Sequence, residues 1–417
     1  MYGRRLLVLI ALLLVAPGAP AREGGVLRVG VSGDYPPFSL LTGEDPIVFE
    51  GFDVAVARAY AEERGRVLIL ERFRWPDLIR DLEADRFDLA MSGVTIVPER
   101  SAMGRFSVPV VETGAVVLAR QPERFPDLAA LNRSIIRIGV NAGGYLERVA
   151  ETQFRRATVV AIPDNVAVLD ALVSQDVHAV LTDTAEASLW MESAEGLKLL
   201  GPFTRDRKAY LVRADRPGLA ADLDRWLLER EADGSLGALR RRHLGENAGP
   251  AVATPLDALL AAVDERLALM PIVGVAKRRE GIALVVERRE ATVLAAAVEA
   301  VHEAAAAAKM PPPSRDLVRA AFRAQIEAAK QVQWAAIKDS RYERPEVVPG
   351  VDEVLRPALL RIGEKIARLI VALPQGLDSE AVRAAARDQL RTARLTETSK
   401  LAIADSIANL SQAPRAQ

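Results

Sequence analysis

Short apolar segments alternate with helical patterns between residues 26 and 245. Six of these segments have the length and composition of buried strands, at residues 26–31, 67–70, 89–92, 135–140, 158–162 and 179–181. Between them, residues 52–63 and 75–84 have the spacing of apolar positions that is typical of helices. Strands that alternate with helices in this way predict parallel α/β sheets.

The pattern changes after Pro255. Apolar residues then recur every three or four positions, as on one face of a helix, at Leu256, Leu259, Leu260, Val263 and Leu267. Alanine-rich helical stretches continue to about residue 410, with proline-containing breaks at 311–313, 345–350 and 374–376. Residues 246–255 have the composition of a flexible linker. The sequence therefore predicts a multidomain protein, with an α/β domain at 22–245 and an all-helical domain at 256–417.

The N-terminus has the pattern of an export signal. Arg4 and Arg5 precede an apolar run at 6–16, and residues 19–21 have the small-x-small pattern of a cleavage site. The run is shorter than the roughly 20 residues that a bilayer requires, so we expect a signal peptide at 1–21, with an N-terminal membrane anchor as the alternative. No later segment has the length and apolarity of a membrane span. We expect a soluble protein that is periplasmic or secreted.

Composition narrows the chemistry that is open to the chain. Its formal net charge of −1 lacks the basic excess that attracts nucleic acid. The chain has no cysteine, and its three histidines, His178, His243 and His302, lie far apart in sequence. Metal sites built on these residue types are therefore not expected, and neither is a cofactor. Catalysis must rest on carboxylates, hydroxyls, amides, lysine and arginine.

Several polar motifs follow expected strands of the first domain. They are GDYPPF at 33–38, SGVT at 92–95 with Arg100 shortly after it, and NAGG at 141–144. Open α/β sheets hold ligands at the carboxyl ends of their strands. The amides of 141–144 precede a helix, where they can face an anion.

Together and in order, these segments resemble periplasmic solute-binding proteins of the amino-acid type, over residues 26–244. The resemblance implies two α/β lobes joined by two crossovers, with the ligand in the cleft between them. Lobe 1 would comprise residues of about 26–112 and 204–245, and lobe 2 residues of about 113–203.

The same resemblance implies roles for individual residues. Arg100, together with Ser92 and Thr95, would form a carboxylate clamp, because a guanidinium fork matches a carboxylate. Tyr35 and Trp75 would form aromatic walls of the cleft.

A narrower set of motifs resembles the cyclohexadienyl dehydratases, which convert prephenate to phenylpyruvate and often arogenate to phenylalanine. The motifs are WPDL at 75–78, DRFDLAMSG at 85–93, PDN at 163–165, TDTAEA at 182–187 and KAYL at 208–211. The resemblance makes Glu186 the general acid and places Gly144 and Lys208 among the substrate contacts. Asp183 matches the residue that contacts the ligand amine in binding-only relatives. Tyr145 departs from the threonine that is usual in the family.

The dehydration needs one acid. Prephenate loses its ring hydroxyl and carbon dioxide, and a glutamic acid can protonate the leaving hydroxyl if desolvation raises its pKa. Closure of the lobes would exclude water from that group. The alternative is a plain amino-acid receptor in which Glu186 is a solvated helix residue.

The helical domain carries a set of charged residues with regular spacing. Arg266 and Lys277 are about three helical turns apart and can face one side of a long helix. Glu290 directly follows Arg289, and the stretch 322–333 places three residues on one stripe, namely Gln325, Ala329 and Gln333. Taken singly, such residues are typical of a solvated helix face.

As a set, these positions resemble the all-helical chorismate mutases, especially the secreted type, over residues 256–373. The resemblance implies that Arg266 and Arg289 bind the substrate carboxylates and that Lys277 serves a carboxylate and the ether oxygen. Glu290 would accept the ring hydroxyl, and Gln333 would donate to the ether oxygen. Lys365 falls where the secreted enzymes tend to carry an arginine, and we also assign it to substrate binding. Because helical mutases are often dimers, the resemblance is also compatible with a homodimer through this domain.

The product of the second domain is the substrate of the first. We therefore expect an exported bifunctional enzyme of phenylalanine biosynthesis that converts chorismate through prephenate to phenylpyruvate, with these small molecules as its partners. One alternative is a mutase fused to a non-catalytic domain that binds an amino acid or an aromatic acid as a sensor. Another is a binding module whose inactive helical half binds a partner.

Overall fold

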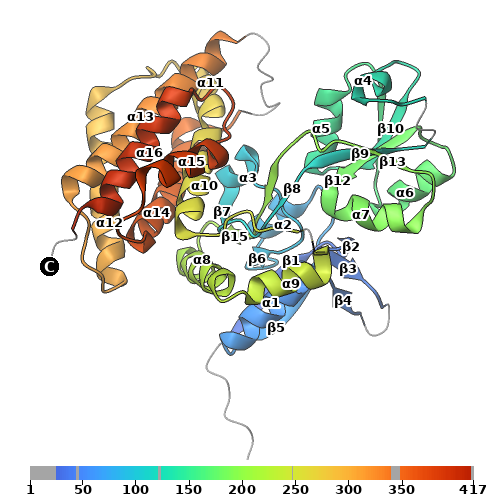
Figure 1. The fold of residues 1–417 in the computed structure, drawn as a ribbon, viewed down its shortest axis with the longest axis horizontal. Helices are drawn as coiled ribbons and strands as arrows, with labels where there is room; N and C mark the ends of the chain where they lie inside the picture. Colours follow the sequence, from blue (N-terminus) through green and yellow to red (C-terminus); the bar gives the residue numbers. More distant parts are fainter. Residues whose placement is uncertain (1–24, 44–46, 121–123, 247, 340–347, 415–417) are drawn as a thin grey trace, which may run out of the picture.

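The computed structural model describes residues 25–43, 47–120, 124–246, 248–339 and 348–414. The expected signal peptide at 1–21 lies outside these residues. Figure 1 shows an α/β region, coloured blue to green, beside a helical region coloured yellow to red. Among the described residues, no helix combines the length and the apolar character needed to cross a membrane.

Lobe 1 is built on a mixed five-stranded sheet in the order β5-β1-β6-β15-β7. The strands are β1 Val26–Val31, β5 Val67–Arg72, β6 Leu89–Ala90, β7 Gly104–Phe106 and β15 Leu211–Arg213. Strand β1 pairs in parallel with β5 and β6, whereas β15 runs antiparallel to its neighbours. The helices are α1 Phe52–Glu63, α2 Leu78–Glu83, α3 Pro98–Met103, α8 Pro217–Ala232 and α9 Ser235–Leu244. A small sheet of β2 Asp34–Tyr35, β3 Ser39–Leu41 and β4 Phe49–Glu50 lies beside the lobe.

Lobe 2 has a second five-stranded sheet, in the order β11-β10-β12-β9-β13. Its strands are β9 Ala115–Ala119, β10 Arg137–Asn141, β11 Thr158–Ile162, β12 Ala179–Asp183 and β13 Lys198–Leu200. Its helices are α4 Leu128–Leu131, α5 Tyr145–Gln153, α6 Val166–Val173 and α7 Thr184–Ser193. Two antiparallel strands, β8 Val111–Thr113 and β14 Asp206–Lys208, connect the lobes. We call this pair the hinge strands.

The helical region starts at a well-formed N-terminus. Thr254 and Asp257 form a capping box, and Pro255 occupies the first turn of α10. The helices are α10 Pro255–Ala268, α11 Met270–Arg279, α12 Glu287–Ala307, α13 Arg315–Lys338, α14 Arg356–Ala372, α15 Ser379–Gln389 and α16 Glu397–Gln412. A π-helical turn, η1 Val351–Leu355, leads into α14. Pro271 lies in the first turn of α11 and separates it from α10, because proline removes a helix hydrogen bond.

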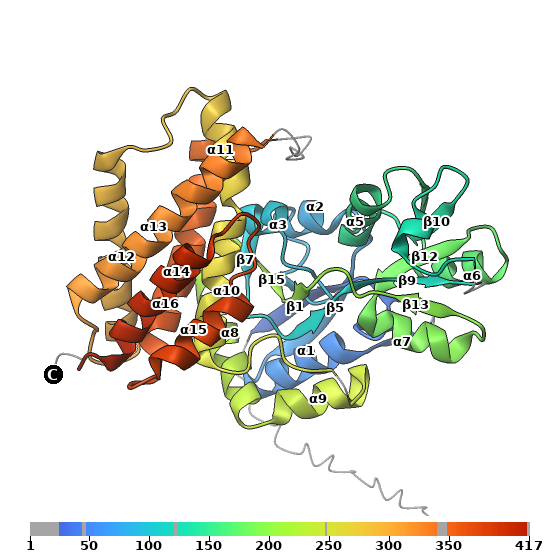
Figure 2. The same cartoon turned by 45° about the horizontal axis from the view of Figure 1, so that its top comes forward.

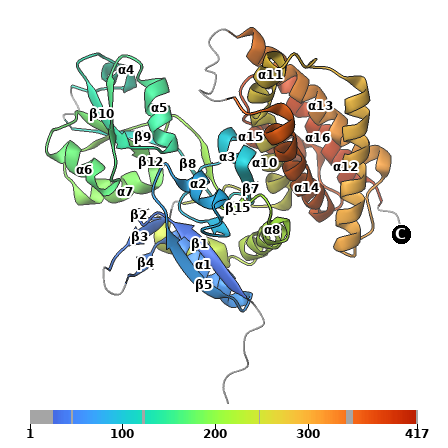
Figure 3. The same ribbon diagram turned by 180° about the vertical axis from the view of Figure 1, so that it is seen from behind.

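Lobe 1 and the helical region share a core. One cluster of buried apolar residues includes members of both, such as Val29 of β1 and Leu260 of α10. Helices α10 and α14 contact α3, and α14 also contacts β7 (Figure 2). Figure 3 shows lobe 2 on the side of lobe 1 that faces away from the helices. Ala251 and Val252 of the expected flexible linker are buried, so this segment packs against the protein.

The fold class predicted from the sequence is confirmed. An α/β domain of the periplasmic-binding-protein type occupies the first half, and an all-helical region follows it. The expected helix at 75–84 is shorter than predicted, because α2 begins only at Leu78. Pro76 explains the difference, since a proline disfavours helical geometry in the residue before it.

Candidate active sites

A narrow pocket of about 40 Å³ lies between the two lobes. Both lobes contribute side chains to it, and the strand β14 adds Lys208 from the hinge. The lining residues are Tyr35, Trp75, Gly93, Thr95, Arg100, Asn141, Gly144, Tyr145, Leu146, Asn165 and Lys208. Six of the sequence-predicted substrate contacts are therefore brought together in one place.

Arg100 is a buried cation on the wall of this cleft. Its guanidinium lies 5.0 Å from the centre of the Trp75 ring and donates to the carbonyl of Thr95 at 3.1 Å. Burial lowers its pKa to about 10, with the charge of Arg148 acting in the same direction. Within the described part of the chain, no carboxylate forms an ion pair with Arg100. A buried cation that is not paired with a carboxylate fits an anionic ligand.

Glu186 lies directly behind the cleft wall. Asp183 caps the N-terminus of α7, which places Glu186 in the first helical turn with 1% of its surface exposed. The Thr182 hydroxyl lies 2.5 Å from one carboxyl oxygen, and the Asn165 amide donates to the other at 2.6 Å. Burial raises the pKa of Glu186 well above its ordinary value, and this effect outweighs the opposing hydrogen bonds. The reading of Glu186 as a solvated helix residue is therefore wrong.

Asp183 is held by a hydrogen-bonded cluster that spans the two lobes. One carboxylate oxygen accepts from the amides of α7, and the other pairs with Lys208 Nζ at 3.0 Å. The Tyr35 hydroxyl donates to the Asp183 oxygen that pairs with Lys208. Lys208 also donates to Thr95 Oγ1 at 3.0 Å. The negative charge of Asp183 is thus already balanced inside the protein.

Ser92 is not part of the cleft. Its hydroxyl is buried among Ser32 and Ser39, at 2.8 and 2.6 Å, and accepts from the Ser32 amide at 3.1 Å. The prediction that Ser92 helps to clamp a carboxylate is wrong, because its side chain is used inside lobe 1. The next residue, Gly93, lines the cleft instead and has a φ of 59°. A Cβ atom there would lie 2.6 Å from the Tyr35 ring.

Lobe 2 contributes three polar residues that were not among the predicted contacts. Asn141 lines the cleft with its buried Nδ2 atom lacking a hydrogen-bond partner. Asn165 also donates to the carbonyl of Asp34 in lobe 1 at 3.0 Å, so it bridges the lobes. The Tyr145 hydroxyl donates to Asp206 at 2.8 Å. Asn141 and Asn165 stand in quoted motifs, but spacing alone could not show that their side chains face the cleft.

A second cavity, of about 410 Å³, lies within the helical region. Elements α10 to α14 and η1 supply its walls. The candidate mutase residues that line it are Arg266, Lys277, Arg289, Glu290 and Gln333. Arg356 and Lys330 line it as well, although neither was among the predicted contacts.

The helical cavity has an excess of positive charge. Arg266 is 8% exposed and its Nη1 atom has no hydrogen-bond partner, while burial lowers its pKa to about 10. Burial also lowers the pKa of Lys277, and neighbouring Arg356 adds to this effect. Glu290 is the acidic residue among the lining side chains, and it pairs with Lys330 at 3.3 Å. Such a cavity suits a small anion with more than one negative charge.

Lys365 does not belong to this cavity. Its ammonium is buried against lobe 1, where it pairs with Glu265 at 2.5 Å and donates to the carbonyl of Phe106 at 3.1 Å. The helix explains why the prediction is wrong. Lys365 lies nine residues after Arg356 on α14, and about 100° per residue puts the two on opposite faces.

Comparison with known proteins matches the α/β region. Residues 27–246 match the family of bacterial extracellular solute-binding proteins, family 3. A cyclohexadienyl dehydratase of Pseudomonas aeruginosa is 36% identical over 219 residues, which cover 51% of this chain and 81% of that protein. The ABC transporter arginine-binding protein 1 of Escherichia coli is 29% identical over 55% of this chain and 94% of that protein. The crystal structure of an ancestral amino-acid-binding protein, described as a precursor of cyclohexadienyl dehydratase, aligns with a TM-score of 0.50 and 27% identity. It covers 53% of this chain and 96% of that one.

Proposed function

Because the chain belongs to the bacterial extracellular solute-binding proteins of family 3, we propose that it is an exported protein whose two-lobed domain is a cyclohexadienyl dehydratase. The observation that carries this proposal is the buried carboxyl of Glu186 beside the cleft, where burial raises its pKa and so favours the protonated form. The 36% identity to a cyclohexadienyl dehydratase supports the same activity.

In this reaction, Glu186 gives its proton to the ring hydroxyl of prephenate, which leaves as water. The bond to the ring carboxylate breaks, carbon dioxide departs, and its electron pair completes the aromatic ring of phenylpyruvate. Arg100 binds the carboxylate of the pyruvyl side chain, which stays in the product. General-acid catalysis by one positioned side chain contributes roughly 10²–10⁴ in rate.

The cleft must open to admit this substrate. The Asn165 side chain lines the pocket, contacts Glu186, and reaches across to the carbonyl of Asp34. Separation of the lobes about the hinge strands breaks that cross-lobe bond and exposes the wall in front of the acid. Closure then removes water from Glu186, which restores its raised pKa.

We further propose that the helical region is a chorismate mutase. Its support is the cavity in which Arg266, Lys277 and Arg289 face a single acid. Chorismate carries two carboxylates, and cations that hold both select the reactive conformer of a unimolecular rearrangement. Lys277 and Gln333 would then stabilise the charge that develops on the ether oxygen. The combined protein converts chorismate through prephenate to phenylpyruvate.

Product analysis with the purified chain tests both proposals. We expect phenylpyruvate from added chorismate and also from added prephenate. Accumulation of prephenate from chorismate, with no further conversion, would show a mutase fused to a binding domain. Unchanged chorismate together with dehydration of prephenate would remove the mutase proposal alone.

Two substitutions assign the activities to their sites. Glu186→Gln should lower kcat for dehydration by about 10²–10⁴, while Glu192→Gln, an exposed residue of the same helix, should leave it unchanged. Lys277→Ala should lower the mutase rate by about 10²–10³, with the exposed neighbour Arg278→Ala as its control. Unimpaired dehydration in the Glu186 variant would show that another group is the acid.

A further inference from the structure

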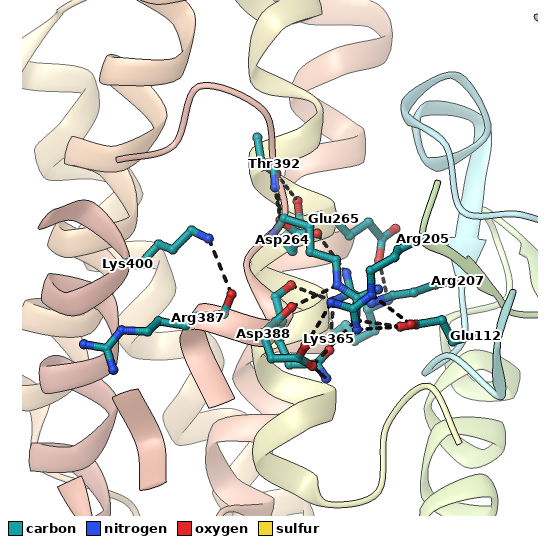
Figure 4. Close-up of polar contacts among 12 residues, drawn as sticks. Glu112, Arg205, Arg207, Asp264, Glu265, Lys365, Arg387, Asp388, Thr392 and Lys400 are labelled. Carbon is teal, nitrogen blue, oxygen red and sulfur yellow. Dashed lines mark hydrogen bonds and ion pairs between the residues drawn. The ribbon is translucent and has the colours of Figure 1, made fainter. Parts of the chain in front are cut away.

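A buried ion pair connects the helical region to the hinge strands (Figure 4), and buried hydrogen bonds connect it to lobe 1. Arg207 of β14 is 8% exposed, and its partner Asp264 of α10 is 7% exposed. Around this pair, Arg205 contacts both Glu112 and Asp388 at 2.9 Å. The helices therefore form ion pairs with the hinge strands, about which the lobes must move.

Asp264 is held in place within the helical region and in turn holds Arg207, and we call it the first anchor. One of its carboxylate oxygens accepts from the backbone amides of Arg391 and Thr392 at 2.8 and 2.7 Å. The other oxygen pairs with Arg207 Nη1 at 2.8 Å. Arg207 Nη2 also donates to the carbonyl and side-chain oxygens of Gln389, at 2.6 and 2.8 Å. The Arg207 guanidinium is thus fixed by several contacts from the helical region.

This anchor acts on the strand that carries a cleft residue. Neighbouring residues of a strand point to opposite faces, and in β14 Arg207 faces the helices while Lys208 faces the cleft. Lys208 contacts Thr95 of lobe 1 and Asp183 of lobe 2 at 3.0 Å each. The position of the β14 backbone therefore decides where this ammonium stands between the lobes.

A second anchor holds the helix that carries the cleft arginine. Glu265, the next residue of α10, accepts from the Ser101 hydroxyl at 3.0 Å and pairs with Lys365 at 2.5 Å. Ser101 follows Arg100 on α3. Arg361 of α14 donates to the carbonyl of Ala102, also on α3, at 2.6 Å. Helix α3 has fewer than two turns, so it has little rigidity of its own.

We propose that Asp264 and Glu265 are positioning residues for the dehydratase cleft. Asp264 acts through Arg207 on the strand that presents the cleft lysine, and Glu265 acts through Ser101 on the helix that presents the cleft arginine. The helical region then acts on the dehydratase cleft from outside, because none of its described residues lines the cleft. The proposal rests on the dehydratase function stated above.

Two conservative variants of the full chain test it, Asp264→Asn and Glu265→Gln. Each keeps the shape of the side chain and removes the charge that holds the anchor. Because both anchors serve substrate-binding cations and neither touches Glu186, KM for prephenate should rise at least fivefold while kcat changes less than twofold. A residue needed only for folding would instead lower the active fraction, which reduces the apparent kcat and leaves KM unchanged.

Glu364→Gln is the matched control, because Glu364 pairs with Arg105 of β7 at the same interface but is half-exposed, and no residue of β7 lines the cleft. Its KM should stay within twofold of the parent. A KM within twofold of the parent in both anchor variants, or a fall in kcat alone, overturns the proposal.

Amide hydrogen exchange separates this proposal from the dehydratase assignment. Residues 206–208 and 98–103 should exchange faster in the respective anchor variants than in the parent and in Glu364→Gln. A parent chain that does not dehydrate prephenate removes the proposed function, and the exchange rates then decide the positioning role by themselves. Unchanged exchange in both segments overturns it.

Discussion

The two cavities use buried charge in opposite ways. Burial raises the pKa of the Glu186 carboxyl and so favours its neutral form, which has a proton to donate. In the helical cavity, burial lowers the pKa of Arg266 only to about 10, so the guanidinium remains charged at neutral pH and retains an unpartnered nitrogen. One site thus offers the proposed acid, and the other offers fixed positive charge, which the proposed rearrangement needs because it transfers no proton.

The raised pKa of Glu186 predicts a dependence on pH. Dehydration should proceed at its full rate while the carboxyl is protonated, and it should fall about tenfold per pH unit once the pH exceeds the raised pKa. The proposed mutase reaction of the same chain needs no such proton, so its rate should not show this fall with rising pH. Rates measured from added prephenate and from added chorismate across one pH series check this. A dehydration rate that falls between pH 4 and 5 would contradict a raised pKa.

The same shift predicts a stability effect. Because the folded pKa lies above the unfolded value near 4.5, the stabilisation from this group is fully present below that value and is lost as the pH rises through the folded pKa. Glu186→Gln removes the titration, so the variant should gain stability relative to the parent as the pH rises. Urea unfolding of both proteins at about pH 4 and pH 8 measures the difference. A difference that does not change with pH would contradict the prediction.

Because Lys208 balances the charge of Asp183, removal of Lys208 should allow the cleft to bind a ligand that carries an amine. Lys208→Ala leaves a buried carboxylate without its cation, which costs about 3–5 kcal/mol. A ligand ammonium can recover that cost, so L-arginine should raise the melting temperature of this variant and not that of the parent. Lys198→Ala, in the same region of the chain but on the outside of lobe 2, is the control. No response to L-arginine in the Lys208 variant would show that the carboxylate is not available to an amine.

The sequence predicted correctly which side chains line a site where a motif determines both the position of the residue and the direction of its side chain. The pair Lys277 and Gln333 lines the cavity as the spacing requires, and Arg100 lies in the cleft. Ser92 could not be placed from spacing, because the competing hydroxyls of two other serines lie on distant parts of the chain. Lys365 was misplaced because the sequence did not show that Arg356, which lies on the opposite face of α14, is the residue that lines the cavity.

At the scale of elements, the local sequence predicted the ends of helices and strands correctly where turn and cap signals are strong. Strands β1 and β11 and helix α1 have the predicted limits. Contacts between elements were beyond the sequence. Nothing in the composition of the linker indicates that Val252 is buried, since that depends on the surfaces that the two domains present to each other.

The lobes meet at Gly143, which predicts a defect in closure. Gly143 precedes α5 in lobe 2 with a φ of 74°, and a Cβ atom there would lie 2.8 Å from the backbone nitrogen of Pro76 in lobe 1. Gly143→Ala should therefore hold the lobes apart and raise KM for prephenate about tenfold. Gly196→Ala is a close control, because its φ is 73° and no atom lies within 4 Å of the added carbon. Both variants carry a similar backbone strain of about 1–2 kcal/mol, so an equal effect on KM would show that strain, not closure, is responsible.

At the scale of the whole molecule, lobe 1 and the helical region form one body. They share a core cluster, and the described polar contacts from the helices to the α/β domain fall on lobe 1 and the hinge strands. Lobe 2 has its own core clusters and is joined through the hinge strands. We therefore expect lobe 2 to move when the cleft opens, while the helical cavity keeps its position relative to α3.

The two cavities have no lining residue in common, which predicts that their activities can be supplied by different chains. A mixture of Glu186→Gln and Lys277→Ala chains should convert chorismate to phenylpyruvate, because each protein retains the step that the other lacks. Prephenate must then pass through solution, so phenylpyruvate should appear after a lag that shortens as the concentration of the Lys277 variant rises. Either variant alone should give no more than residual phenylpyruvate. A mixture that forms none would mean that one substitution damages both cavities, and that coupling through α10 is stronger than the separate linings imply.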